Sequence, residues 1–171
     1  MPGWTGPTRA TPWPALTERA FLQGSWKASK RSRMAEVLSS GLAEIVEDEE
    51  SVARFLTSAS QFNASGAKPS AFLPNPKNGQ TSVFGHGNQP SESLWRIGHE
   101  HVTAFRTLHG AAIVKTMHIR SAGLDVVAQE PPPRHANIIG WPWSQSDPDL
   151  EKAKQKELAA LIAQWAEVLP P

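Results

Sequence analysis

The stretch SESLWRIGHEHVTAFRTL, residues Ser91 to Leu108, decides the fold that this sequence predicts. Its apolar residues recur at intervals of three and four, so they share one face of a helix. Those residues are Leu94, Trp95, Gly98, Val102, Phe105 and Leu108. Ser91 can cap the start of such a helix, and Gly110 beyond the stretch favours its end. We therefore predict a helix from Ser91 to Leu108 at the centre of the hydrophobic core.

Short segments rich in β-branched and apolar residues surround this helix, which is the pattern of strands. We predict strands at Val52–Ser58, Thr81–Phe84, Ala111–Val114, Leu124–Val127 and Ala136–Ile139. Ala71–Leu73 lies between prolines, so we expect an edge strand or an extended segment there. The Asn78–Gly79 pair favours a tight turn and predicts a hairpin that continues into Thr81–Phe84.

Two further helical segments are expected in the C-terminal half. One is a helical turn over Met117–Ala122, closed by Gly123, and the other is a longer helix that begins at Asp147 or Asp149. The expected apolar stripe of the longer helix contains Leu158, Leu161, Ile162 and Trp165. Together the segments predict an α+β fold, in which a small, mainly antiparallel sheet carries a central helix and a C-terminal helix packed on it.

The chain of 171 residues divides by composition into three parts. Residues 1–33 mix Trp, Pro, Gly and Ser without a helical or strand period, so we interpret them as disordered, as a basic arm, or as upstream sequence before a start at Met34. Residues 34–50 predict a short amphipathic helix over Met34–Val46, followed by an acidic, solvated linker. Residues 51–171 are predicted to form a single α+β domain.

Composition argues against several functional classes. The chain has no cysteine, which removes disulfides, thiol catalysis and thiolate metal sites. No apolar run reaches the roughly 20 residues that cross a bilayer, and the N-terminus lacks the pattern of a secretion signal. The formal net charge of +1 gives no general attraction to nucleic acid or to an anionic membrane. We therefore expect a soluble, cytoplasmic protein without a membrane partner.

The segment Pro131–Trp143 combines three prolines with Arg134, His135, Asn137 and a Trp-Pro-Trp sequence. The prolines restrict the backbone, which lowers the entropic cost of presenting the side chains that follow. In an extended segment His135 and Asn137 lie on one face and Arg134 on the other. This pattern predicts either a site or a buried hydrogen-bond knot that fastens the loop to the core. Trp141 is expected either to stack on a ligand or to anchor the loop.

Several segments resemble a family of small, uncharacterised bacterial proteins. They are Arg54-Phe55 with Ser58 and Phe62, Lys68–Pro74 (KPSAFLP), Thr81–Phe84 (TSVF), and Pro132–Ile138 with Gly140–Pro142 (PPRHANI and GWP). The likeness covers the chain from Val52 to Leu169, and Gly85 stands where the pattern leads us to expect Arg. That family carries no assigned activity, so the resemblance implies a bacterial origin and a domain boundary but no catalytic residues.

Other residues can contribute chemistry if the fold brings them together. Arg54, Lys68, Arg106, His109 and Arg134 are candidates for one cationic pocket that suits a phosphate. For Arg106 and His109, at the end of the central helix, compensation of the helix dipole is a simpler explanation. Ser58, Ser60, Ser70 and Ser82 are candidate nucleophiles for His135, and the sequence favours none of them.

The sequence predicts neither a metal site nor a cofactor. His99 and His101 are two residues apart, so they point to different sides of a helix and cannot share one ion there. No phosphate-binding loop, dinucleotide fingerprint or nucleophile-elbow motif is present in the sequence. Any chemistry must therefore come from side chains that the fold brings together.

Two functions follow from these residues. The preferred one is a non-catalytic interaction module that contacts a protein partner or a nucleic-acid phosphate through the loop Pro131–Trp143. The alternative is an enzyme that acts on a phosphate-bearing or nucleotide substrate, with His135 as acid and base, Asn137 orienting it, and Arg134 or Arg54 binding the anion. An enzyme requires a concave pocket where His135 and at least two cations converge, whereas a module can keep His135 buried beside a flat rim.

Overall fold

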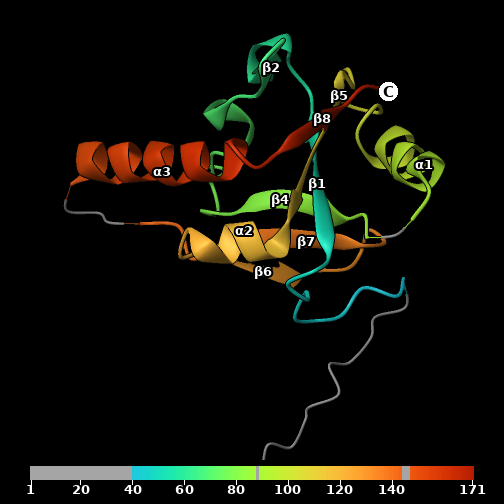
Figure 1. Cartoon of the computed structure of the whole chain (residues 1–171), viewed down its shortest axis with the longest axis horizontal. Coiled ribbons are helices and arrows are strands. Elements are labelled where there is room, and N and C mark those ends of the chain that lie inside the picture. Colours follow the sequence, from blue (N-terminus) through green and yellow to red (C-terminus); the bar gives the residue numbers. More distant parts are fainter. Residues whose placement is uncertain (1–39, 88, 144–146) are drawn as a thin grey trace, which may run out of the picture. The chain divides into compact units, whose positions relative to one another are not determined.

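A six-stranded antiparallel sheet carries the fold, and its strand order is β6-β7-β4-β1-β5-β8 (Figure 1). The computed structural model describes residues 40–87, 89–143 and 147–171. The strands of the sheet are β1 Ser51–Leu56, β4 Thr81–Gly85, β5 Gly110–Lys115, β6 Asp125–Ala128, β7 His135–Ile139 and β8 Glu167–Leu169. A small second sheet pairs β2, Phe62–Asn63, with β3, Gly66–Ala67. The interpretations of residues 1–33 fall outside the described residues.

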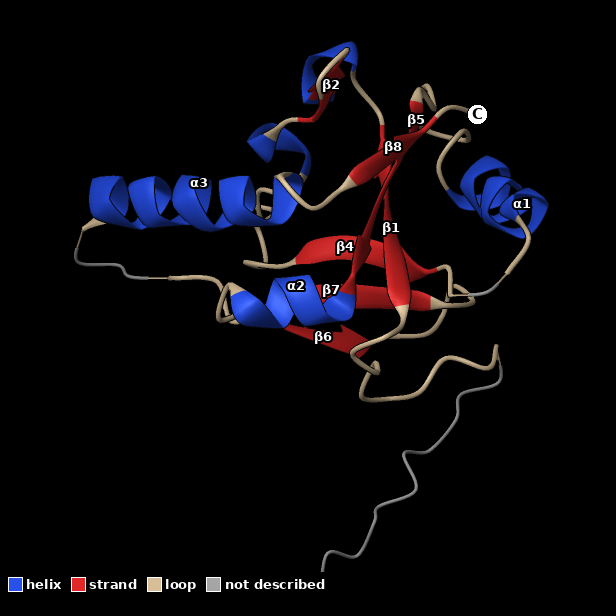
Figure 2. Cartoon of the chain, viewed as in Figure 1, coloured by secondary structure: helices blue, strands red, loops and turns tan. Residues whose placement is uncertain are grey.

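Helices cover both faces of the six-stranded sheet (Figure 2). Within the described residues the helices are α1 Ser91–His101, α2 Thr116–Ser121 and α3 Pro148–Ala163, with two short 3-10 turns, η1 Ala59–Gln61 and η2 Pro69–Ala71. On one face, Leu94 and Ile97 of α1 pack against Phe55 and Phe84 of the sheet. On the other face, α2, α3 and the chain after η2 build a larger core around Phe72. The predicted α+β class, with its mainly antiparallel sheet, is confirmed.

The sheet bends sharply between β1 and β4, and the bend makes room for a site. β1 pairs with β5 along its whole length but with β4 only through Val52 and Ala53. In Figure 2, β1 and β5 run steeply across β4, β7 and β6. The next residue of β1 is Arg54, whose Nη1 donates a hydrogen bond to the Ser82 carbonyl of β4 at 2.8 Å. A side chain thus joins the two strands where their backbone ladder has ended.

The predicted central helix over Ser91–Leu108 exists but ends early, at His101. Just beyond that end, Thr103 Oγ1 donates to the carbonyl of His99 at 2.6 Å. Such a side-chain bond competes with the backbone bonds that would extend the helix. The helix also starts without the predicted cap, because Pro90 rather than Ser91 occupies the N-cap position. The chain that follows the helix is free to turn over the sheet and line the site.

The proline-rich segment before β4 does not form a strand. Pro69–Ala71 makes the turn η2, because proline favours the first positions of a helical turn. The predicted edge strand over Ala71–Leu73 is therefore wrong, and the predicted hairpin is wrong too, since β4 pairs with β1 and β7. The tight turn itself is confirmed, because Gly79 adopts a φ of 67° and its N–H bonds the Asn75 carbonyl at 2.8 Å.

Residues 40–50 also differ from the prediction. Residues 40–46 are not helical, and Gly41 has a φ of 82°, which interrupts a right-handed helix. The predicted helix Met34–Val46 is therefore wrong where it is described, and its first six residues lie outside the described part. Leu42 and Val46 are buried in the larger core. Glu47, Asp48 and Glu49 of the acidic run are exposed, as predicted for a solvated segment. The run is also tied to the domain, because Asp48 pairs with Arg120, Glu49 with Lys115 and Glu50 with Arg134.

The C-terminal helix α3 begins where predicted, but its apolar stripe is different. Asp147 caps the helix, since its Oδ1 accepts from the N–H of Leu150 at 3.0 Å. Leu161 and Trp165 of the predicted stripe are exposed, whereas Ile162 is buried. The residues of α3 that face the core are Gln155, Ala159, Ile162 and Ala163. This side of α3 packs against the turn η2.

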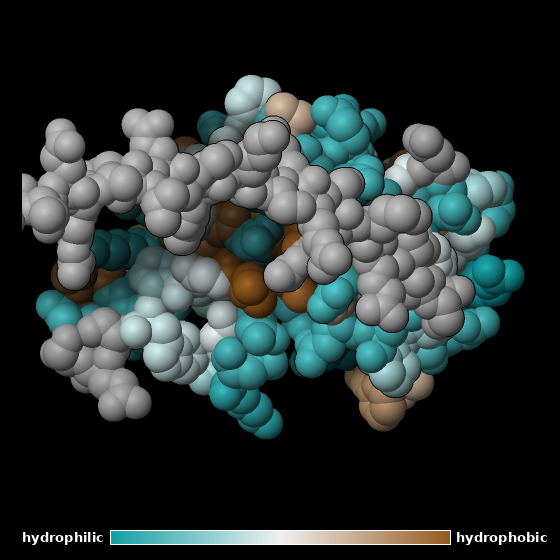
Figure 3. All heavy atoms as spheres, turned by 90° about the horizontal axis from the view of Figure 1, so that it is seen from below, coloured by the Kyte–Doolittle hydropathy of each residue, from teal (hydrophilic) through white to brown (hydrophobic). Residues whose placement is uncertain are grey.

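One face of the described part of the molecule is mainly polar, as Figure 3 shows. On the face drawn in Figure 3, hydrophilic residues dominate the described part, with a small apolar area near the centre. None of the helices in the described ranges is long and apolar enough to cross a membrane. Among the exposed apolar side chains Phe105 is extreme, with 87% of its surface exposed. It belongs to the turn after α1, beside the pocket described next.

Candidate functional site

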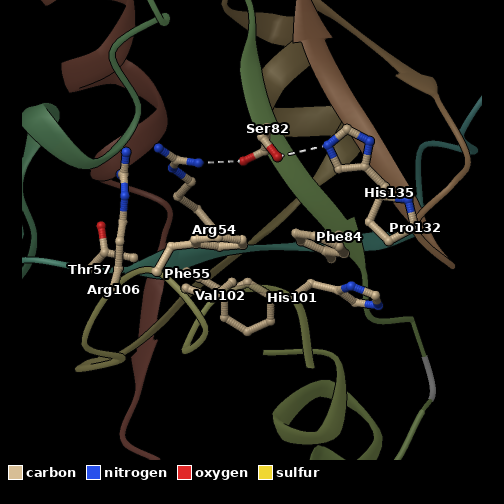
Figure 4. A pocket seen from close by; sticks show the side chains of 11 residues that line it. Arg54, Phe55, Thr57, Ser82, Phe84, His101, Val102, Arg106, Pro132 and His135 are labelled. Carbon is tan, nitrogen blue, oxygen red and sulfur yellow. Dashed lines mark hydrogen bonds between the residues drawn. The ribbon is translucent and has the colours of Figure 1, made fainter. Parts of the chain in front are cut away.

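A pocket of about 320 Å³ opens beside the bend of the sheet, between β1, β4, β7 and the turn after α1 (Figure 4). Its apolar wall contains Phe55, Phe84, Val102, Phe105 and Pro132, and its polar wall contains Arg54, Thr57, Ser82, His101, Arg106 and His135. None of the described residues that line it is acidic. A volume of a few hundred Å³ with a few convergent polar groups is typical of a site for a small molecule.

Strands β4 and β7 position the nucleophilic and basic groups. In their antiparallel register, Ser82 stands opposite Asn137, and Phe84 stands opposite His135. Since side chains alternate along a strand and opposite residues point the same way, these four side chains share one face of the sheet. The predicted common face of His135 and Asn137 is confirmed.

His135 makes hydrogen bonds through both ring nitrogens. Its Nδ1 lies 2.8 Å from the carbonyl oxygen of Gln129. A carbonyl oxygen only accepts, so Nδ1 carries the proton of the neutral ring and Nε2 is left as the acceptor. Nε2 lies 2.7 Å from the Oγ of Ser82, whose hydroxyl therefore donates to it. The ring also packs edge-on against Phe84, with 5.2 Å between the ring centroids.

Arg54 brings a positive charge to the same pocket. Its Nε donates to the Ala71 carbonyl at 2.9 Å and its Nη1 to the Ser82 carbonyl at 2.8 Å, so the guanidinium is fixed in place. Burial, together with the charge of Arg106, lowers the pKa of Arg54 from its ordinary value to about 10. Figure 4 shows the two guanidinium groups side by side, near Ser82. Neither arginine takes part in an ion pair between described residues.

A second hollow, of about 520 Å³, adjoins the pocket and shares Arg54, Ser82 and Arg106 with it. It continues along residues 73–80 as far as Asn137. The Nδ2 of Asn137 donates to the side-chain oxygen of Gln129, the residue whose carbonyl orients His135. The prediction that Asn137 orients His135 directly is therefore wrong. Asn137 instead holds Gln129, whose carbonyl orients the ring of His135.

Arg134 lies outside the pocket and is bound within the domain. Its Nε donates to the Gly85 carbonyl at 2.8 Å, its Nη1 to the Ser40 carbonyl at 3.3 Å, and its Nη2 to Glu50 at 2.7 Å. The predicted anion-binding role of Arg134 therefore finds no support in this structure. Gly85 is confined by the same cluster, because a Cβ there would lie 2.7 Å from Leu42.

Three other predicted site residues are not brought to the pocket. Lys68 precedes the turn η2, and His109 follows α1, with its ring 6.3 Å from that of Phe62. Trp141 is 6% exposed and packs in the larger core, as an anchor of the loop. Lys68, His109 and Trp141 are absent from the described lining of the pocket. The described ranges also contain no group of three or more His, Asp or Glu residues that could hold a metal ion.

No family model, no curated protein and no solved structure matches this chain. The resemblance to a family of small bacterial proteins therefore stays a prediction. What the pocket can do has to be judged from its residues and their geometry.

The sequence named Ser82 only as one of four candidate serines, and it did not point to Gln129 at all. The alternation of Thr81–Phe84 places Ser82 and Phe84 on one face, but it does not say which strand lies beside them. Ser82 and His135 are 53 residues apart, and only the register of β4 against β7 brings them together. Gln129 orients the imidazole through its backbone carbonyl, which every residue has and no sequence motif can mark.

Proposed function

We propose that the pocket binds a phosphate-bearing substrate, such as a nucleotide, and that His135 acts on it as acid and base. One observation carries the proposal: two guanidinium groups and an oriented Ser82-His135 pair converge in one concave pocket whose described lining holds no carboxylate. Preorganised cations beside a general base are what transfer or hydrolysis of a phosphate ester requires. This arrangement favours the enzyme among the two functions predicted from the sequence.

The electrostatics of Arg54 favour an anionic ligand. A cation that is desolvated and repelled by Arg106 is destabilised, as its lowered pKa indicates. An anion that binds between the two guanidinium groups removes that repulsion, and arginine matches phosphate oxygens in two-pronged geometry. The aromatic wall of Phe55, Phe84 and Phe105 suits the ring of a nucleotide or of another aromatic ester.

The interaction module predicted first stays a prediction, with less support. That function depended on the loop Pro131–Trp143 presenting its side chains to a partner. Arg134 and Trp141 of the loop are engaged within the domain, and His135 faces a pocket instead of a flat rim. The loop supplies the lining residues Pro132 and His135, which suits a small ligand better than a large surface.

Removal of Arg106 tests the binding part of the proposal. We expect inorganic phosphate and adenosine 5′-monophosphate to bind the wild-type protein in calorimetry, and Arg106→Gln to bind them roughly 10- to 100-fold more weakly, since a charge-assisted contact contributes about 1.5–3 kcal/mol. Arg106 is exposed, so its replacement should leave the fold intact. Arg96→Gln is the matched control, because Arg96 is exposed on α1 and is not among the lining residues. Equal affinities of wild type and Arg106→Gln would contradict the proposal.

Phosphate affinity should also fall at alkaline pH. The pKa of Arg54 is about 10 in the free protein, and a bound anion raises it further, so binding requires the protonated guanidinium. Affinity is therefore expected to be constant well below that pH and to fall above it, by up to about tenfold per pH unit. Calorimetry between about pH 8 and about pH 10.5 measures the effect. The same measurement on Lys77→Gln excludes a contribution from Lys77, which lines the adjoining hollow. A phosphate affinity that does not change with pH would contradict the expected role of Arg54.

A further inference from the structure

We propose that Ser82 is the nucleophile of this pocket and that it forms a phosphoseryl intermediate with the substrate. The inference rests on the proposed function, which supplies the phosphate ester. The proposed function leaves open whether His135 activates a water molecule or a serine, and this inference chooses the serine. The hydroxyl of Ser82 already donates to Nε2 of His135 at 2.7 Å, which is the geometry of a serine beside its base.

Of the four serines that the sequence left open, only Ser82 contacts a histidine among the described residues. Ser58 and Ser60 share a hydrogen bond of 2.8 Å between their hydroxyls on the exposed turn η1. Ser70 directs its Oγ to the Ser60 carbonyl at 3.4 Å. Ser82 is partly buried, lines the pocket and stands next to Arg54 (Figure 4). The fold thus selects one serine from four equivalent candidates.

The base of this pair is itself held by a third group, which completes the usual arrangement of an activated serine. That group is the carbonyl of Gln129, 2.8 Å from Nδ1 of His135. Gln129 is fixed in turn, because its N–H donates to the His135 carbonyl at 2.8 Å. A backbone carbonyl keeps one proton on Nδ1, and it stabilises the imidazolium that forms when Nε2 also takes a proton. Gln129 is therefore a positioning residue that acts through His135.

Water is the only reactant besides the ester that the proposed reaction needs. Ser82 Oγ attacks phosphorus, the Oγ–P bond forms, and the bond from phosphorus to the leaving alcohol breaks. His135 Nε2 takes the hydroxyl proton and passes it to the leaving oxygen. Water then attacks the phosphoseryl group, its proton goes through His135 to Ser82, and the Oγ–P bond breaks. One ester and one water give one alcohol and one phosphate, while Arg54 and Arg106 bind the non-bridging oxygens.

Diisopropyl fluorophosphate tests the nucleophile without knowledge of the natural substrate. It transfers its phosphoryl group to a serine that a base activates, and fluoride leaves. We expect one adduct on the wild-type chain, mapped to Ser82 by peptide mass spectrometry. The adduct should be absent from Ser82→Ala and should form on the order of 100-fold more slowly in His135→Gln. Ser60→Ala is the matched control and should react like the wild type, and near-ultraviolet circular dichroism shows that each variant is folded.

Each outcome of this experiment decides the inference. An unmodified wild type, an adduct at another serine, or an equal rate in His135→Gln would overturn the role of Ser82. Calorimetry with inorganic phosphate on the same preparation separates this failure from failure of the proposed function. Phosphate binding without an adduct would leave the proposed function and remove the nucleophile. An adduct at Ser82 without phosphate binding would keep the nucleophile and overturn the phosphate ligand.

Discussion

Replacing Phe72 with alanine should lower the free energy of unfolding by about 3–5 kcal/mol, the cost of a large cavity in a packed core. Phe72 is 0% exposed and belongs to the larger core, where the turn η2 packs against α3. Its carbonyl also accepts a hydrogen bond from Thr81 Oγ1 at 2.8 Å, which ties this turn to β4. Urea denaturation, followed by tryptophan fluorescence, measures the loss as a lower midpoint with an unchanged slope.

Phe105→Ala is the matched control, since it removes the same atoms from a side chain that is 87% exposed. Its expected effect on the free energy of unfolding is within about 0.5 kcal/mol. A similar loss of stability in both variants would mean that the turn after α1 packs against the core in solution. A small loss in Phe72→Ala alone would mean that the segment around η2 does not complete the core.

This pair of phenylalanines shows what the sequence can and cannot predict about the fold. Helical spacing placed Phe105 on the buried face of the central helix, and the surrounding prolines placed Phe72 on an edge strand. The helix ends before Phe105, because Thr103 bonds back to the carbonyl of His99, while η2 turns Phe72 into the core. Periodicity predicts which residues can share a face of a helix, but it does not show the side-chain bonds that compete with the helix at its end.

The long, regular elements were predictable because several local signals agree on each of them. The strands β1, β5 and β7 combine apolar spacing with turns at their ends, and the helix α3 has the predicted start at Asp147, so the structure contains all four. The three-residue strand β8 was missed, since Glu167–Leu169 has no alternation long enough to read. β8 pairs with β5 only because α3 brings the end of the chain beside that strand, and local sequence patterns do not show this.

The candidate site was predictable in part. His135 and Asn137 were placed correctly on one face, because alternation along a strand is a local property. Arg54 and Arg106 were named as possible cations, and the bend of the sheet brings them together. Arg134 was equally plausible by charge, but its partner Glu50 lies 84 residues away. Which cations are paired and which face a pocket depends on such distant partners, so sequence alone cannot separate them.

Replacing Arg54 with lysine should weaken phosphate binding by about 10- to 100-fold, although the formal charge is kept. The guanidinium donates to the carbonyls of Ala71 and Ser82 and still has N–H groups left for a ligand. One ammonium cannot reach both carbonyls and a phosphate as well, and an unbonded buried carbonyl costs about 1–3 kcal/mol of stability. Calorimetry with inorganic phosphate and urea denaturation measure the two effects separately.

A comparison of the two side chains shows why arginine suits position 54 better than lysine. Burial and the neighbouring charge of Arg106 lower the pKa of Arg54 to about 10, which still leaves it charged at neutral pH. A lysine starts from a pKa of about 10.4, so the same environment would bring its ammonium close to losing its proton. Arg120→Lys is the matched control, because Arg120 pairs with Asp48 and Asp125 and none of the three lines the pocket. That variant should lose stability but keep its phosphate affinity, and equal weakening of binding in both variants would show that Arg54 acts only through the fold.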